Sequence, residues 1–186
     1  MDKSKIWRIE SEEEIFNSRL FNIYNLNCYL ESKNLSHNFY SIKMHDWINV
    51  FAMTSDKKII LVKQHRLGKN IVTSEVPAGA INENEDPFVA ARRELFEETG
   101  YTTSNLKLLK KISVNPAIQN NICYFFIALE CQKTNNTNFD TAEELEVVLN
   151  EKSEINNLID SSVIDNSLSY LSIILAREYL IKVGEI

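Results

Sequence analysis

The segment from Gly79 to Tyr101 constrains the fold of this chain more than any other, because it gathers most of the residues that interrupt regular structure. The chain of 186 residues contains four Gly and three Pro. Pro77, Gly79, Pro87 and Gly100 all lie in or beside this segment, although such residues are normally spread over all the turns of a domain. The local backbone is therefore closely specified here.

A capped helix is predicted inside this segment. Asp86 followed by Pro87 is typical of an N-cap and a first helical residue. Gly100 is typical of the left-handed residue that ends a helix. We therefore expect a helix from about Pro87 to Thr99.

Three glutamates share one face of the predicted helix. Glu94, Glu97 and Glu98 are separated by three and four residues, so at about 100° per residue they lie within an arc of roughly 100°. Ala90 projects in the same direction one turn earlier. Its small side chain is expected to leave room for an ion or a phosphate.

Two explanations account for like charges placed so close together, which destabilise a helix by roughly a few tenths of a kcal/mol per pair. A hard divalent cation would neutralise them, and Mg²⁺ suits this role because it accepts carboxylates and bridges phosphate oxygens. Alternatively, the glutamates form a solvated face paired with Arg92 and Arg93, as is usual for Glu on helices.

The spacing of the fixed residues resembles the signature of the Nudix hydrolases. The matching positions are Gly79, Glu85, Arg93, Glu94, Leu95, Glu97, Glu98 and Gly100. Tyr101 departs from the pattern, since the family usually has an aliphatic residue there. The resemblance implies an α+β fold, namely a Nudix-type α/β/α sandwich with a mixed β-sheet.

The resemblance also implies roles for these side chains. Glu94, Glu97 and Glu98 would bind a divalent metal, Mg²⁺ or alternatively Mn²⁺, and Glu97 and Glu98 would act in catalysis. Gly79, Glu85 and Arg93 would support them. A bound metal lowers the pKa of water and neutralises charge on the pyrophosphate oxygens.

Stretches outside this segment resemble one branch of the family, the ADP-ribose pyrophosphatases and nucleoside-diphosphate-sugar hydrolases. They are DWINVFAM, ILVKQHRLG, SEVPAGAI and NPAIQNN. By this resemblance Arg66 contacts the diphosphate or the nucleoside, Glu75 lies near the site, and Ala78 offers its backbone carbonyl to a metal. Pro116 and Ala117 would contact substrate, although Asn115-Pro116-Ala117 replaces the Ser-Pro-Gly of the branch.

The branch places a further acidic residue in a late loop, where it completes the metal site or acts as the base. The stretch AEELEVV, residues 142–148, matches that position. Glu143 is the first choice and Glu144 the alternative.

We therefore predict a divalent-metal-dependent hydrolase that cleaves the pyrophosphate of a nucleoside diphosphate sugar, such as ADP-ribose, to a nucleoside monophosphate and a sugar phosphate. One alternative is another Nudix substrate: a nucleoside triphosphate, a dinucleotide, coenzyme A or FAD. The other is a non-catalytic nucleotide-binding module, which the intact Glu94, Glu97 and Glu98 disfavour.

Composition excludes several other classes. A net charge of −6 and a pI near 5.2 disfavour a general nucleic-acid binder, which would carry a basic patch. The N-terminus lacks an apolar signal region, and no stretch approaches the roughly 18 apolar residues that span a membrane, so we expect a cytoplasmic protein. Cys28, Cys123 and Cys131 lack CxxC spacing and are expected to be buried, reduced thiols.

Hydrophobic alternation indicates an N-terminal β element at residues 1–44, and the family resemblance implies a Nudix hydrolase domain at residues 45–186. In the first part, alternation predicts strands at 21–30 and 39–44. Since an N-terminal antiparallel sheet commonly builds a homodimer in this branch, with the partner completing the site, we expect a homodimer.

The second part should contain several strands and two late helices. We expect strands at 47–54, 59–63, 71–76, 106–112, 122–129 and 145–149. A short amphipathic turn or helix is predicted at 154–159. A terminal helix should follow a cap at Asp165 or Asn166, with a core-facing apolar stripe formed by Leu168, Leu171, Leu175 and Tyr179.

Overall fold

The computed structural model describes residues 2–134 and 144–186, and the chain divides into two compact units. One unit consists of Met1–Asp46 and Ile112–Ile122, and the other of Trp47–Lys111 and Cys123–Ile186. The expectation that residues 1–44 serve dimerisation and residues 45–186 hydrolysis stays a prediction.

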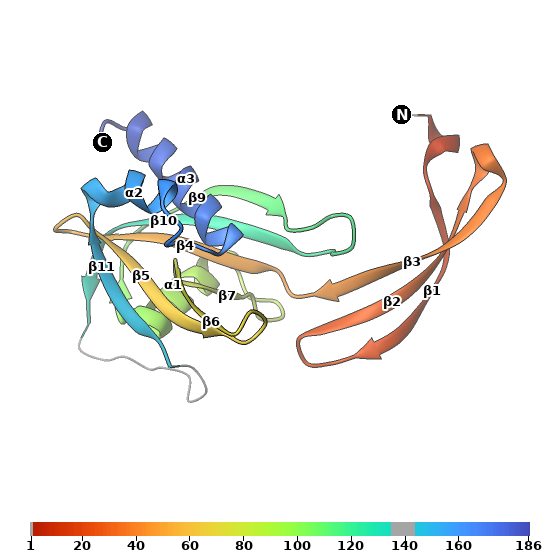
Figure 1. The fold of residues 1–186 in the computed structure, drawn as a ribbon, viewed down its shortest axis with the longest axis horizontal. Coiled ribbons are helices and arrows are strands. Elements are labelled where there is room, and N and C mark those ends of the chain that lie inside the picture. Colours follow the sequence, from red (N-terminus) through yellow and green to blue (C-terminus); the bar gives the residue numbers. More distant parts are fainter. Residues whose placement is uncertain (1, 135–143) are drawn as a thin grey trace. The chain divides into compact units, whose positions relative to one another are not determined.

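The structure is α+β, as predicted (Figure 1). The strands are β1 (Arg8–Asn17), β2 (Phe21–Leu30), β3 (Leu35–Met44), β4 (Trp47–Thr54), β5 (Lys58–Arg66), β6 (Ile71–Glu75), β7 (Ala78–Ala80), β8 (Tyr101–Thr102), β9 (Asn105–Ser113), β10 (Ile122–Lys133) and β11 (Glu146–Glu151). The helices are α1 (Pro87–Thr99), α2 (Ile155–Asp160) and α3 (Ser167–Lys182), with 3₁₀ turns η1 (Lys3–Lys5), η2 (Glu31–Lys33) and η3 (Lys152–Glu154).

The first unit is a three-stranded antiparallel sheet in the order β1, β2, β3. Strand β1 is not predicted by the sequence pattern, because its run of glutamates has no apolar alternation and the whole strand is exposed. Its charged side chains are instead paired across the sheet: Glu12 with Lys43 at 2.6 Å, and Glu14 with the hydroxyl of Tyr24 at 2.8 Å. Such cross-strand pairs stabilise a strand without burial.

The second unit is built on a mixed sheet with the strand order β11, β5, β4, β10, β8. β4 pairs parallel with β10 and antiparallel with β5 and β7, while β6 pairs with β5 and β9 with β10. β4 and β5 form an antiparallel hairpin joined through residues 55–57.

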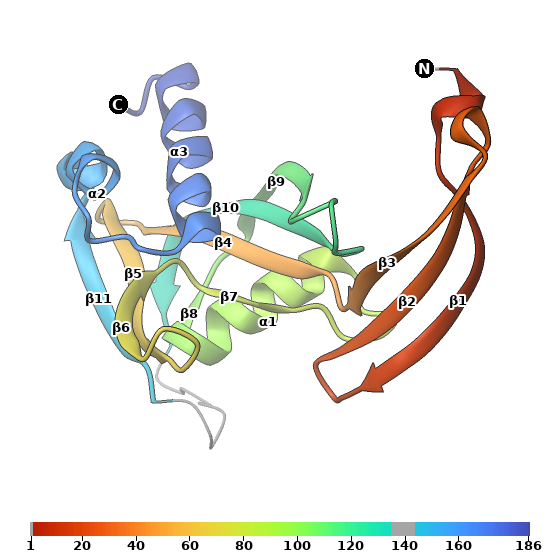
Figure 2. The ribbon, with the colours of Figure 1, turned by 45° about the vertical axis from the view of Figure 1, so that its right-hand side comes forward.

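Helices cover both faces of this sheet, which gives the predicted α/β/α sandwich (Figure 2). Alternate residues of β4 divide between two cores: Ile48, Val50 and Ala52 pack on the α1 side, whereas Phe51 and Met53 pack on the side of α2 and α3. The period of two in a strand thus fixes which helix each side chain meets.

Helix α1 has the predicted bounds and caps. The Asp86 carboxylate accepts hydrogen bonds from the backbone N–H groups of Phe88 and Val89, and Gly100 adopts the left-handed conformation with φ of 71°. A left-handed residue at this position favours Gly, which lacks the Cβ that penalises other residues there.

The buried face of α3 differs from the predicted leucine stripe. The stripe of Leu168, Leu171, Leu175 and Tyr179 is half-buried. The fully buried residues lie one position further round and are Ser169, Ser172, Ile173, Ala176 and Leu180. Because three of these side chains are small, the helix backbone can approach the sheet closely, and the larger leucines flank that contact.

All three cysteines are buried thiols that are not joined by disulfides, as predicted. Burial raises the pKa of the Cys131 thiol to about 12, so this thiol is not a nucleophile. No helix among the described residues combines the length and apolar character needed to cross a lipid bilayer.

Candidate active site

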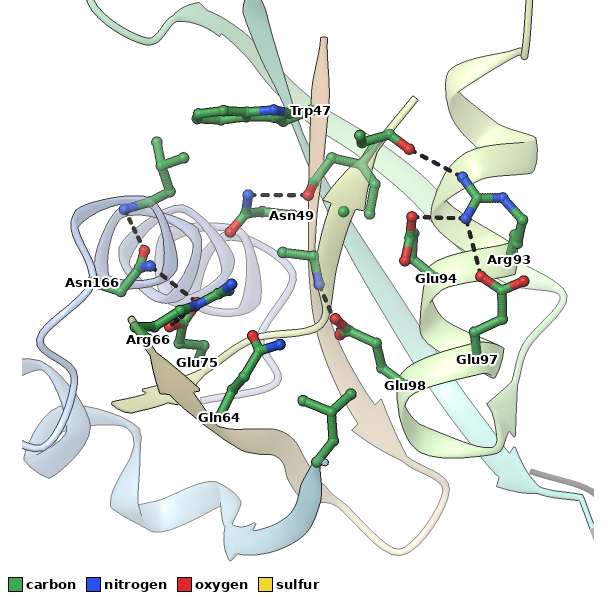
Figure 3. A pocket seen from close by; sticks show the side chains of 16 residues that line it. Trp47, Asn49, Gln64, Arg66, Glu75, Arg93, Glu94, Glu97, Glu98 and Asn166 are labelled. Atoms are coloured by element: carbon green, nitrogen blue, oxygen red, sulfur yellow. Dashed lines mark hydrogen bonds and ion pairs between the residues drawn. The ribbon is translucent and has the colours of Figure 1, made fainter. Parts of the chain in front are cut away.

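A cavity of about 450 Å³ opens on the second unit (Figure 3). This volume lies within the range of sites that bind small molecules. Its lining residues are Trp47, Ile48, Asn49, Gln64, Arg66, Glu75, Ala78, Gly79, Ala80, Arg93, Glu94, Glu97, Glu98, Leu145, Asn166 and Leu168. They come from β4, β5, β6, β7, α1, the residue before β11 and the start of α3, so the sandwich brings distant segments together.

Arg93 organises the acidic side of the cavity. Its Nε and Nη2 donate to the two carboxylate oxygens of Glu85, each at 2.8 Å. Its Nη1 donates to Glu94 at 2.7 Å and to Glu97 at 3.0 Å, and Nη2 also donates to the backbone carbonyl of Ala80 at 3.1 Å. Bidentate pairing of this kind fixes orientation as well as charge.

The ion pair between Arg93 and Glu85 stabilises the charged form of both side chains. The hydrogen bonds from Arg93 lower the pKa of the Glu85 carboxyl from 4.5 to about 2. The same bonds, together with the charges of Glu94 and Glu97, raise the pKa of Arg93 above its ordinary value. Glu85 therefore stays ionised at every pH at which the protein is expected to work.

Glu98 connects the helix to β7. Its Oε2 accepts a hydrogen bond of 3.0 Å from the backbone N–H of Ala78, and Glu98 is only 6% exposed. Glu97, by contrast, has 40% of its side chain exposed. The two neighbouring carboxylates thus differ in solvation, one being fixed against the sheet and the other open to the solvent.

Gly79 provides the space in which the Glu94 carboxylate lies. A Cβ added at Gly79 would overlap the carboxyl group of Glu94. Sequence analysis assigned this space to Ala90, and that prediction was wrong: Ala90 is fully buried in the core with Ala91 and Leu95. These three residues form the sheet-facing side of α1, and Glu94 lies at its border.

A second polar group contains a buried carboxylate. Glu75 is 1% exposed and accepts hydrogen bonds of 2.8 Å from both Nε and Nη2 of Arg66. The Thr73 hydroxyl and the Asn166 side chain also donate to it, at 2.5 Å and 3.0 Å. Burial opposes ionisation of Glu75, but these bonds outweigh it, so its pKa lies below the ordinary value.

The predicted site residues fall into three sets. The cavity brings together Arg66, Glu75, Ala78, Gly79, Arg93, Glu94, Glu97 and Glu98. Glu85 contacts Arg93 from beside the cavity. Pro116 and Ala117 belong to the first unit and are not lining residues. Glu143 lies outside the described residues, and the alternative Glu144 is exposed, although its neighbour Leu145 lines the cavity.

Sequence analysis missed several lining residues. For two of them a signal existed. Asn49 is a polar residue within the apolar strand β4, and Gln64 precedes Arg66 by two positions, which places both on the same face of β5. Trp47, Leu145 and Leu168 carry no such signal. Asn166 was recognised only as a candidate cap.

The donor chemistry of the acidic side fits a hard divalent cation. Glu94, Glu97, Glu98 and the backbone carbonyl of Ala78 offer only oxygen ligands, which Mg²⁺ prefers. Among the described residues no three acidic, His or Cys side chains are arranged to hold a metal ion. Arg93 donates hydrogen bonds to Glu94 and Glu97, and the Ala78 N–H donates to Glu98. A bound cation would therefore replace some of these hydrogen bonds with metal–oxygen contacts.

Comparison with known proteins identifies relatives. The NUDIX domain profile matches residues 44–161. The methanol dehydrogenase activator of Bacillus methanolicus is 38% identical over 91 residues, covering 48% of each chain. The ADP-ribose pyrophosphatase of Bacillus subtilis (strain 168) is 32% identical over 120 residues, covering 64% of each. The match thus spans 48% and 64% of the length of these two relatives.

A solved structure shares the fold. The crystal structure of an ADP compounds hydrolase matches with a TM-score of 0.87 at 21% sequence identity, over 97% of each chain.

Gly79→Ala should weaken cation binding while leaving the protein folded. The added Cβ displaces the Glu94 carboxylate, which is the end of a flexible side chain. The substitution therefore changes the position of a proposed cation ligand and leaves the backbone in place. We expect the affinity for Mn²⁺, measured by titration calorimetry, to fall by about tenfold or more. Gly68→Ala is the matched control because a Cβ there meets nothing within 4 Å. Equal affinities of the two variants would contradict this role for Gly79.

The Glu85–Arg93 pair should make stability depend on acidic pH. Folding lowers the pKa of Glu85 from 4.5 to about 2, so the contribution is complete above pH 4.5 and is lost as the pH falls towards 2. The free energy of unfolding in urea should therefore decrease more steeply for the wild type than for Glu85→Gln over this window. Parallel pH profiles would contradict the assignment.

Proposed function

Because the chain belongs to the Nudix family, we propose that it is a divalent-metal-dependent hydrolase of nucleoside diphosphate sugars. It cleaves the pyrophosphate of ADP-ribose or a related nucleotide sugar to a nucleoside monophosphate and a sugar phosphate. The observation that carries this proposal is the cavity itself, in which a carboxylate cluster and a fixed arginine line one volume of about 450 Å³.

The carboxylates of α1 supply the cation ligands in this proposal. Glu94, Glu97 and Glu98 bind Mg²⁺, or alternatively Mn²⁺, together with the carbonyl of Ala78. A cation held by these residues would lower the pKa of water and neutralise charge on the pyrophosphate oxygens. Arg93 orients Glu94 and Glu97 through hydrogen bonds of 2.7 and 3.0 Å, and its own position is set by Glu85.

The exposed Glu97 is suited to orient the attacking water, since 40% of its side chain is accessible to solvent. Glu98 is suited to bind the cation rigidly, because burial and the Ala78 N–H fix its carboxylate. A general base must reach the water within hydrogen-bond distance, and Glu143 is the proposed further ligand or base.

Arg66 supplies the positive charge for the substrate. Its guanidinium is fixed by Glu75 and lines the cavity, so it can pair with phosphate oxygens in a preset orientation. Pro116 and Ala117 are proposed to contact the remaining part of the substrate. The name of the Bacillus subtilis relative, ADP-ribose pyrophosphatase, supports ADP-ribose as the first substrate to test.

A homodimer is proposed because the first unit leaves much apolar surface exposed. Nine of its large apolar side chains are exposed, namely Ile6, Ile9, Ile15, Phe16, Leu20, Leu35, Phe39, Tyr40 and Ile118. Exposed apolar residues gathered on one small sheet are typical of a surface that a partner covers. The aromatic group of Trp7, His37 and Phe39 would form part of this interface.

Glu98→Gln should abolish turnover without unfolding the protein, since Gln keeps the shape of Glu but provides no anionic ligand. We expect hydrolysis of ADP-ribose with Mg²⁺ to fall by about two orders of magnitude or more, measured as release of AMP. Glu83→Gln, at an exposed position of the preceding loop, is the matched control. Undiminished activity of Glu98→Gln would contradict the proposed mechanism.

A panel of compounds, each assayed for its own hydrolysis products, identifies the substrate. ADP-ribose, ADP-glucose, GDP-mannose, FAD, coenzyme A and nucleoside triphosphates are compared with Mg²⁺ and Mn²⁺. Turnover of only FAD, coenzyme A or nucleoside triphosphates would indicate another Nudix reaction. Binding without turnover of any compound would indicate a non-catalytic nucleotide-binding module.

The protein should have twice the mass of one 21.5 kDa chain in solution, as measured by light scattering after size-exclusion chromatography. Ile9→Lys, in the exposed strand β1, should favour dissociation, because it places a charge in the apolar interface. Ile181→Lys is the matched control, since Ile181 of α3 is similarly exposed. A wild-type mass near that of a single chain would remove the dimer proposal.

A further inference from the structure

The Glu75 carboxylate is saturated with hydrogen bonds. Oε1 accepts from Arg66 Nε and from the Thr73 hydroxyl, and Oε2 accepts from Arg66 Nη2 and from Asn166 Nδ2. An ionised carboxylate offers about four acceptor sites, so all of them are used. A buried anion is costly unless it is bonded in this way.

The hydrogen bonds of the Glu75 carboxylate fix the orientation of the Arg66 side chain. The edge of its guanidinium formed by Nε and Nη2 faces Glu75, which places Nη1 on the side turned away from Glu75. The guanidinium is planar and its donors have a fixed geometry. Whatever orients Glu75 therefore also orients Arg66 at the wall of the cavity (Figure 3).

Asn166 performs two functions with one side chain. Its Oδ1 caps α3 by accepting hydrogen bonds of 3.0 Å from the backbone N–H groups of Leu168 and Ser169. Its Nδ2 simultaneously donates to Glu75 at 3.0 Å. Of the common N-cap residues, only Asn has an amide that donates from a second atom while its oxygen caps the helix.

Two neighbouring contacts support this arrangement. The Ser169 hydroxyl, in the first turn of α3, accepts a hydrogen bond of 3.2 Å from the backbone N–H of Val76, so the same turn contacts two consecutive residues. The adjacent Asp165, the other predicted cap, instead forms a surface ion pair of 2.6 Å with Lys69.

We propose that Asn166 is a positioning residue that orients the Arg66 guanidinium, through Glu75, towards the diphosphate of the substrate. This inference rests on the proposed function, in which Arg66 contacts the diphosphate. It assigns to the start of α3 a role in substrate binding in addition to helix capping.

Asn166→Ser separates the two roles of this residue. Ser preserves a good N-cap oxygen but lacks the amide that reaches Glu75. Asn166→Asp is the second variant: it caps equally well and places a carboxylate against Glu75. Asn156→Ser is the matched control, because Asn156 accepts a hydrogen bond of 2.6 Å from Arg177 at an exposed position, and neither residue lines the cavity.

Two readouts are compared in variants shown by circular dichroism to be folded. In the ADP-ribose assay, Asn166→Ser should raise KM by about tenfold with kcat changed little, which corresponds to one lost hydrogen bond to a charged group. Binding of inorganic pyrophosphate to the metal-free protein, measured by calorimetry, should weaken similarly. Asn166→Asp should weaken both further, and Asn156→Ser should match the wild type.

A double-mutant cycle tests whether Asn166 acts through Glu75. If it does, Asn166→Ser should have little further effect on pyrophosphate affinity in a Glu75→Gln background. The inference would be overturned by additive effects in this cycle or by an unchanged KM and pyrophosphate affinity in Asn166→Ser. It would also be overturned if both Asn166 variants failed to fold or if the wild type bound no pyrophosphate. Failure of the proposed function differs from these outcomes: the wild type would then hydrolyse none of the compounds, while pyrophosphate binding still depends on Asn166.

Discussion

The contacts of Arg93 are the constraint on which the acidic side of the cavity depends. One guanidinium contacts Glu85 in the loop before α1, Glu94 and Glu97 on the helix and the carbonyl of Ala80 on β7. Without it, three carboxylates would repel one another. With it, the group still contains more carboxylates than cations. Arginine pairing and cation binding, which the sequence presents as alternatives, are therefore compatible: Arg93 orients the carboxylates, and negative charge remains for a metal to neutralise.

The five residues from Glu75 to Gly79 connect the acidic side to the other wall of the cavity. Glu75 fixes Arg66, and Val76 contacts Ser169 of α3 through its N–H. Further along, the Ala78 N–H donates to Glu98, and Gly79 leaves space for Glu94. The distance between Arg66 and the carboxylates of α1 is thus set by one short stretch of backbone, which these contacts anchor at both ends.

The parts of the site that are local in the sequence were predictable, and those that depend on packing were not. The bounds and caps of α1 follow from Asp86, Pro87 and Gly100, since capping acts over a few residues. The location of the space beside the carboxylates was assigned to Ala90 on helical periodicity alone, whereas β7 supplies it through Gly79. Strand β1 was missed for a related reason, because its glutamates are stabilised by Lys43 and Tyr24 across the sheet.

Asn166 shows why the substrate-facing wall is harder to predict than the acidic one. A cap motif in the sequence specifies an oxygen for the helix, and Asp165 or Asn166 would satisfy it equally. Only the packing of α3 against residues 75 and 76 gives the amide of Asn166 a second partner, 91 positions away in the chain. The acidic wall is encoded mainly by one continuous segment, while the opposite wall is assembled from β4, β5, β6 and the start of α3. Substitutions in the second wall can therefore alter which ligand binds without disturbing Arg93 and the carboxylates, so differences in specificity among proteins with this fold should be sought there.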